Sequence, residues 1–183
     1  MAGKLKSIAV YCGHQFGNDP KFKQDAIAVG AMLAKNGIRM VFGGGDVGLM
    51  GAVATSALEN GGMVIGVSTD EVVARQEPAH ADVNVHIVNG VNERKQRMFE
   101  LSDAFIIMAG GIGTLNELTD IMTMQQIGET DKPLFFLNTN NFWGAFSELV
   151  RHMINQGFVE SLEDYRMYNA DTVAELTEQI LSY

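Results

Sequence analysis

Several residue types are scarce in this sequence, and each scarcity excludes a class of protein. Cys12 is the only cysteine, so the chain can form no intrachain disulfide and no CxxC metal or redox motif. Only 13 Lys and Arg stand against 22 Asp and Glu, which gives a net charge of -9, whereas nucleic-acid binding needs many cations to neutralise phosphates. No apolar run approaches the roughly 20 residues that span a bilayer, and residues 1–6 contain no signal-peptide apolar region. We therefore expect a cytoplasmic protein that binds neither nucleic acid nor membrane.

Motifs for metal binding and nucleophilic catalysis are also missing. The histidines, His14, His80, His86 and His152, form no HxH or HExxH pattern, so we expect no metal site. No GxSxG sequence presents a nucleophilic serine, and no GxxxxGK[ST] sequence marks a P-loop. No lysine lies in an evident pyridoxal-phosphate context. We expect a protein without a cofactor.

The sequence does contain many glycines and a regular alternation of apolar and amphipathic segments. It has 20 glycines but 3 prolines in 183 residues, which indicates tight turns inside a compact fold. Short apolar runs alternate with helical periodicity, which is typical of a parallel sheet with helices on both faces. We predict a single Rossmann-like, nucleotide-binding domain over residues 1–183. Its fold class is doubly wound α/β, with a mostly parallel sheet. The individual elements follow from this pattern. The predicted strands are residues 8–11, 38–42, 64–67, 85–88, 104–108 and 134–137, and the predicted helices are residues 21–36, 49–60, 92–101, 115–126, 143–156 and 172–183.

One stretch resists this assignment. Residues 68–84 carry Pro78, His80 and several charges without clean periodicity. A flexible lid, an edge loop and a further short helix all remain open there.

Two glycine-rich segments lie where predicted strands give way to predicted helices. The first glycine turn, residues 43–51, reads GGGDVGLMG, and the second glycine turn, residues 109–114, reads AGGIGT. In open α/β sheets ligands bind outside the carboxyl ends of the strands, and glycine lets several backbone amides converge on one phosphate. For one such segment alone, close packing of strand against helix explains the glycines equally well. Two segments at equivalent strand ends favour an anion site.

Charged residues near the starts of two predicted helices are candidates for chemistry. Glu117 lies in the helix after the second glycine turn, while Arg94 and Lys95 lie in the helix after the strand at 85–88. An arginine can hold a phosphate or carboxylate through two parallel hydrogen bonds. The simpler interpretations are a helix-capping role for Glu117 and a solvated helix face for Arg94. A functional role is favoured because both residues project to the sheet edge that carries the glycine turns.

Taken together, these motifs resemble those of the LONELY GUY family, the cytokinin riboside monophosphate phosphoribohydrolases, many of which were long labelled possible lysine decarboxylases. The similarity runs from Ile8 to the C-terminal helix, and its motifs are highly specific as a set. They are GGGxxGLMG at residues 43–51, ERK at residues 93–95 and GGxGTxxE at residues 110–117. The resemblance implies hydrolysis of the N-glycosidic bond of a nucleoside 5'-monophosphate to a free base and ribose 5-phosphate.

The resemblance also implies roles for individual residues. Glu117 would act on the ribose and the attacking water, and Arg94 would bind substrate and stabilise charge. Further substrate-binding residues would be Lys95, Gly44, Gly45, Gly110, Gly111, Ile112, Gly113 and Thr114. The family pattern implies a homodimer paired through helices beside the active site, to which the Met-rich segment at 115–126 offers an apolar surface.

At several positions the sequence departs from the family pattern. Ala109 replaces the usual proline before the second pair of glycines, His14-Gln15 replaces Ser-Ser, and Val91-Asn92 replaces Met-His. These changes surround the substrate pocket of the family, so the preferred base stays open. A non-catalytic nucleotide or cofactor carrier that uses the same crevice is the alternative function.

Overall fold

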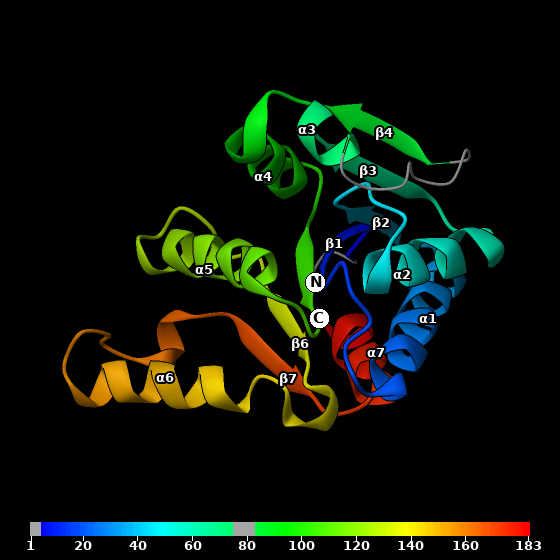
Figure 1. Ribbon diagram of the computed structural model, residues 1–183. Helices are drawn as coiled ribbons and strands as arrows, with labels where there is room; N and C mark the ends of the chain where they lie inside the picture. The colour runs from blue at the N-terminus through cyan, green and yellow to red at the C-terminus, as the bar shows by residue number, and fades with distance from the viewer. Residues whose placement is uncertain (1–4, 75–82) are drawn as a thin grey trace.

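The computed structural model describes residues 5–74 and 83–183, and these residues form a seven-stranded sheet (Figure 1). The strand order is β4-β3-β2-β1-β5-β6-β7, and every neighbouring pair is parallel. The predicted doubly wound α/β class is thereby confirmed. The strands are β1 (Ser7–Tyr11), β2 (Arg39–Phe42), β3 (Val64–Ser68), β4 (Asn84–Ile87), β5 (Ala104–Ile107), β6 (Leu134–Leu137) and β7 (Met167–Ala170).

Helices cover both faces of the sheet, as Figure 1 shows. Leu33 of α1, Val53 of α2 and Leu176 of α7 are buried in one core. Met98 of α4 and Leu118 of α5 are buried in the other core, on the opposite face. The helices are α1 (Pro20–Lys35), α2 (Gly48–Glu59), α3 (Asp70–Val73), α4 (Gly90–Glu100), α5 (Ile112–Gln126), α6 (Gly144–Asn155) and α7 (Val173–Ser182), with short 3-10 turns η1 (Thr139–Asn141) and η2 (Leu162–Asp164).

The central strands are apolar throughout because both of their faces are covered. In β1, Ile8 and Val10 point into the core beneath α1 and α2, whereas Ala9 and Tyr11 point into the core beneath α4 and α5. Side chains alternate across a strand. A strand buried on both faces therefore reads as a continuous apolar run, which made these strands recognisable in the sequence.

The chain reverses its direction of winding between β1 and β5. From β1 it proceeds outward through β2, β3 and β4, and then returns to place β5 on the other side of β1. The loops that follow β1 and β5 consequently lead to helices on opposite faces. In sheets of this kind a crevice opens outside the carboxyl ends of such a strand pair.

The predicted elements agree with the structure to within a few residues, with two additions. Strand β7 is not among the predicted strands, because it is a short edge strand in which only Ala170 is buried. Helix α3 lies in the irregular stretch at 68–84 and corresponds to the short helix that is one of the alternatives there. Pro78 and His80 lie outside the described residues. In the described part of the chain, no helix has the length and apolar character needed to cross a bilayer.

Candidate active site

Gly13, in the loop after β1, connects the two glycine turns. Its N–H donates to the carbonyl oxygen of Ala109 at 3.0 Å. Its own carbonyl oxygen accepts hydrogen bonds from the amides of Leu49 and Met50, at 3.1 and 3.3 Å. These two amides belong to the first turn of α2, so the N-terminus of that helix is occupied by the protein backbone. The first glycine turn therefore fixes the loop after β1.

Gly48 permits this contact. Its φ is +61°, and a Cβ atom there would lie 2.2 Å from the backbone carbonyl carbon of His14. No side chain fits at that separation, and residues with a Cβ rarely adopt this backbone conformation. The sequence Val-Gly-Leu-Met thus brings the N-terminus of α2 against residues 13–15.

The second glycine turn presents its amides differently. Helix α5 begins after Gly111, whose residue type provides no capping side chain. Within residues 5–74 and 83–183, the amides of Ile112, Gly113 and Thr114 donate to no acceptor, and the first helical bond runs from the amide of Leu115 to Gly111. Unpaired amides at a helix N-terminus, together with the helix dipole, favour an anion.

Arg94 and Glu117 form an ion pair beside these amides. Nη1 of Arg94 donates to Oε1 of Glu117 at 3.3 Å, and Nε of Arg94 donates to the carbonyl oxygen of Val67 at 2.9 Å. Both side chains are 12% exposed. Gly43 makes room for the guanidinium, because a Cβ atom there would lie 2.0 Å from Nη2 of Arg94. The first glycine turn thus also seats the arginine.

The carboxyl group of Glu117 has a strongly perturbed acidity. Burial raises its pKa from 4.5 to about 7, against the opposing effects of the Arg94 and Lys95 charges, while the Asp120 charge raises it further. A carboxyl group that titrates near neutral pH suits acid–base chemistry. The neighbouring Cys12 is no nucleophile, because burial and the Glu117 charge raise the pKa of its thiol well above the usual value.

These groups surround a cavity of about 180 Å³, which we call the inner cavity. Its wall combines the second glycine turn and the ion pair with the loop after β1, the first turn of α2 and the short helix α3. It consists of Cys12, Gly13, His14, Met50, Val72, Arg94, Gly111, Ile112, Gly113, Thr114 and Glu117. A cavity with several amide donors, one guanidinium and one carboxylate can hold an anionic sugar phosphate.

A second cavity, of about 340 Å³, adjoins the inner one, and we call it the aromatic cavity. The two cavities share Gly13, His14 and Gly111. Three phenylalanine rings belong to its wall. Besides the three shared residues, the wall consists of Gln15, Phe16, Gly17, Phe22, Leu49, Ala109, Gly110 and Phe142.

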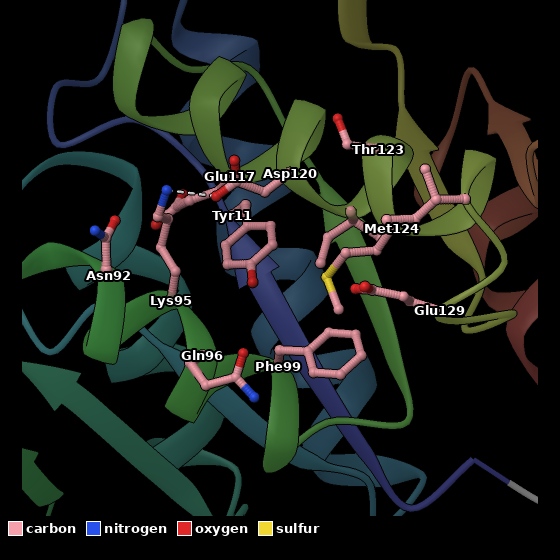
Figure 2. A pocket seen from close by; sticks show the side chains of 12 residues that line it. Tyr11, Asn92, Lys95, Gln96, Phe99, Glu117, Asp120, Thr123, Met124 and Glu129 are labelled. Carbon is pink, nitrogen blue, oxygen red and sulfur yellow. Dashed lines mark ion pairs between the residues drawn. The ribbon is translucent and has the colours of Figure 1, made fainter.

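Lys95 lies elsewhere, in a cavity of about 400 Å³ between α4 and α5 that we call the interhelix cavity (Figure 2). Its Nζ donates to Oδ1 of Asn116 at 3.0 Å and forms an ion pair with Asp120. Tyr11, Phe99 and Met124 supply apolar parts of the same wall. Glu117 lines both this cavity and the inner one, so Lys95 and the second glycine turn lie in different cavities that share this carboxyl group.

The structure brings together most of the site residues that the sequence indicated. Arg94, Glu117 and residues 111–114 line the inner cavity, and Gly110 lines the aromatic cavity. Gly44 and Gly45 line neither, and Gly44 packs against Ser68 instead. Among the departures from the family pattern, Ala109 lies in the aromatic cavity and Asn92 in the interhelix cavity.

Sequence reasoning assigned no role to several residues of the walls. His14 stood out only as a departure from a motif, although it lines both the inner and the aromatic cavity. Met50 belongs to the GGGxxGLMG motif but carries no chemical signal of its own, and Val72 has no sequence signal beyond its apolar character. In the described ranges no three His, Cys, Asp or Glu side chains are grouped for metal binding.

Comparison with known proteins gives consistent matches across the chain. A family model described as possible lysine decarboxylase matches residues 50–180. A cytokinin riboside 5'-monophosphate phosphoribohydrolase of Rhodococcoides fascians is 37% identical over 155 residues, covering 84% of this chain and 78% of that protein. The enzyme of that name called LOG1, from Arabidopsis thaliana, is 33% identical over 180 residues, covering 98% of this chain and 84% of its own.

A molybdenum cofactor binding protein from Rippkaea orientalis is similar in structure. Its TM-score is 0.69, with coverage of 100% of this chain and 98% of its own. The two sequences are 24% identical, so this likeness speaks to the fold alone.

Proposed function

This chain belongs to the LONELY GUY family, and from that premise we propose that it is a nucleoside 5'-monophosphate phosphoribohydrolase. It hydrolyses the N-glycosidic bond of a nucleotide, of the cytokinin riboside monophosphate or AMP type, and releases a free base and ribose 5-phosphate. The names of the relatives that match most of the chain support this activity. We assign the whole reaction to one domain.

One observation carries the proposal: the buried ion pair of Arg94 and Glu117 lies in the same cavity as the unpaired amides of the second glycine turn. The amides suit a phosphate, and the carboxyl group suits the chemistry at the sugar. Retention of a nucleotide does not require a buried carboxyl group whose pKa is raised to about 7, whereas acid–base chemistry at the sugar is served by one. The pair therefore favours a catalyst over a carrier.

The reaction follows from this arrangement. The amides of Ile112, Gly113 and Thr114 hold the 5'-phosphate, which places the ribose towards Glu117. As the bond between C1' and the base lengthens, positive charge develops on the ribose ring, and the Glu117 carboxylate stabilises it. The carboxylate also accepts a proton from water, whose oxygen bonds to C1'. The electron pair of the broken bond leaves with the base.

Arg94 contributes in two ways. Its charge lowers the pKa of Glu117 against the effect of burial, which keeps part of the carboxylate population ionised near neutral pH. Arg94 also lines the inner cavity, where a guanidinium can hold phosphate or ribose oxygens. Arg94 therefore binds substrate and prepares the catalytic group.

The test is incubation of the protein with a panel of nucleoside monophosphates and the matching nucleosides, followed by chromatography of the products. We expect release of base from at least one monophosphate and little or none from its nucleoside, because the amides need an anion to hold. Retention of a nucleotide without base release would support the carrier function instead. Equal turnover of nucleoside and nucleotide would contradict the role of the second glycine turn.

We also propose a homodimer, formed through α4 and α5 beside the interhelix cavity. Val91 of α4 is 55% exposed and Ile127, at the end of α5, is 62% exposed, so this side of the protein carries apolar surface. Met122 is buried in the core, which leaves Met124 as the methionine of α5 that lines the cavity. Light scattering at micromolar concentration should give twice the chain mass, and a strict monomer would contradict the proposal.

A further inference from the structure

The aromatic cavity is well placed for the part of the substrate that the inner cavity cannot hold. It continues from the inner cavity across Gly13, His14 and Gly111. With about 340 Å³ and walls of Phe16, Phe22 and Phe142, it has the size and apolar character of a site for a planar ring system. A nucleotide whose phosphate lies on the second glycine turn can extend its base into this space.

The walls of the aromatic cavity are held in place by contacts between α1 and η1. Oγ1 of Thr139 donates to the buried Asp25 carboxylate at 2.6 Å, and Nδ2 of Asn140 donates to Asp19 at 3.0 Å. The rings of Phe22 and Phe142 meet edge to face at 5.8 Å. These contacts hold the walls of the cavity in place before any ligand binds, so the walls need little reorganisation to receive one.

His14 occupies the boundary between the two cavities. Its backbone is fixed on both sides, because Gly13 bonds to both glycine turns and Gly48 packs directly against the carbonyl of His14. Among the described residues that line the aromatic cavity, His14 is the only titratable one. Glu117 and Arg94, which carry the carboxyl and guanidinium groups of the site, line the inner cavity but not the aromatic cavity.

Cleavage of an N-glycosidic bond has a requirement that Glu117 does not meet. The electron pair of the broken bond moves onto the base, and a purine leaves poorly as an anion, so a proton must reach a ring nitrogen as the bond breaks. Glu117 accepts a proton from the attacking water on the ribose side. A second group on the base side has to donate one, and histidine is the side chain best suited to that task near neutral pH.

We propose that the aromatic cavity binds the base and that His14 is the general acid that protonates it. This rests on the proposed function. The imidazolium transfers one proton to a ring nitrogen of the leaving base, the bond from C1' to the base breaks, and the oxygen of water bonds to C1' while its proton passes to Glu117. Return of that proton to His14, through solvent, restores both groups. No electron acceptor or metal is required.

The test compares two substrates in the wild type and in His14→Ala. The first is the best nucleoside monophosphate found in the panel, and the second is 4-nitrophenyl ribofuranoside 5-phosphate, whose nitrophenolate leaves without protonation. We expect His14→Ala to lower kcat for the nucleotide by about 10²-fold or more, and for the nitrophenyl compound by less than about 10-fold. His152→Ala, which removes an exposed histidine of α6, is the matched control and should leave both rates unchanged.

Each other result contradicts the acid role or one of the premises on which it rests. Equal losses on both substrates would make His14 a positioning residue, and unchanged rates would give it no role. A wild type that hydrolyses the nucleotide but not the nitrophenyl compound would contradict the placement of the leaving group in the aromatic cavity. A wild type that releases base from no nucleotide would contradict the proposed function, which is a different failure.

Binding of the base can be tested separately through Phe16, which lines the aromatic cavity but not the inner one. Phe16→Ala should raise KM for the nucleotide about 10-fold and leave inhibition by ribose 5-phosphate unchanged, because that product lacks a base. Phe158→Ala is the matched control, since Phe158 is 83% exposed and lines none of the three cavities. Parallel weakening of nucleotide and ribose 5-phosphate would contradict a base site in this cavity.

Discussion

The two glycine turns differ in where their backbone amides point. In the first, the amides of Leu49 and Met50 bond to the carbonyl oxygen of Gly13. In the second, the amides of Ile112, Gly113 and Thr114 meet no protein acceptor within the described residues and line the inner cavity. Both segments are rich in glycine and precede a helix, but only the second has donors to offer a ligand.

This difference gives the two turns different roles: the first supports other parts of the site, and the second binds substrate. The first turn fixes the loop that carries His14 and seats the guanidinium of Arg94 against Gly43. The second turn, through α5, supplies the free amides and Glu117. Glycines in the first turn are therefore needed for close backbone approach, and those in the second for access to the amides. Substitutions in the two turns should therefore differ in whether they lower stability or activity.

The largest expected effect is at Glu117, in the helix of the second turn. Glu117→Gln should lower kcat by about 10²–10⁴, because the neutral amide can neither accept the proton of water nor stabilise the ribose cation. Affinity for ribose 5-phosphate should change little, since the phosphate contacts remain. Steady-state kinetics and calorimetry measure the two. If Glu117 were only a helix cap, kcat would stay near the wild-type value and stability would fall by about 1 kcal/mol.

The first turn should show its largest effect on stability. Gly48→Ala should cost about 2–4 kcal/mol, from the unfavourable positive φ and the clash with His14. Gly113→Ala, in the second turn, is the matched control because a Cβ atom there meets nothing within 4 Å. It should leave stability within about 1 kcal/mol. Urea unfolding measures both, and equal losses would remove the distinction between the turns.

Gly43→Ala tests whether the first turn supports the Arg94 guanidinium without contacting substrate itself. The added methyl group would occupy the position of Nη2 of Arg94, and the flexible guanidinium should move away with little loss of stability. We expect kcat/KM to fall by about 10–100-fold, close to the effect of Arg94→Ala. In the double variant the two losses should not add, because each displaces the same group. Additive losses would show that Gly43 acts independently of Arg94.

The most gradual effect, about tenfold per unit of pH, is the pH dependence that Glu117 confers. Its pKa is raised to about 7, and catalysis requires the carboxylate, so kcat/KM should fall about tenfold per unit as the pH drops below about 7. The proton is held more tightly in the folded state than in the unfolded chain. The stability contribution of Glu117 should thus decline as pH rises from about 4.5 to about 7. A flat kcat/KM profile across this window would exclude Glu117 as the base.

Much of the fold could be predicted from the sequence because its signals are local. Buried strands such as β5 and β6 read as apolar runs, and Asp19-Pro20 marks the start of α1 through a side-chain cap and a proline in its first turn. Strand β7 could not be predicted, because it is held by pairing with β6 and not by its own composition. The motifs identified Arg94 and Glu117 as site residues. They did not predict that the two side chains contact each other, because the residues lie far apart in the sequence.

The rest of the site depends on tertiary contacts that composition does not encode. Gly43 and Gly113 both belong to glycine-rich segments, but one faces a guanidinium and the other faces open space. Lys95 adjoins Arg94 in sequence, yet it pairs with Asp120 on the interhelix side. The amides of Leu49 and Met50 are occupied because of the position of Gly13, which lies far from both of them along the chain.

The most direct test of this account is amide NMR of the protein titrated with ribose 5-phosphate. The amides of Leu49 and Met50 should exchange slowly with solvent in the free protein, and their resonances should hardly shift on titration. The amides of Ile112, Gly113 and Thr114 should exchange rapidly in the free protein, shift on binding and become protected. Protection of Leu49 and Met50 by the ligand, with residues 112–114 unaffected, would contradict the assignment of the phosphate to the second glycine turn.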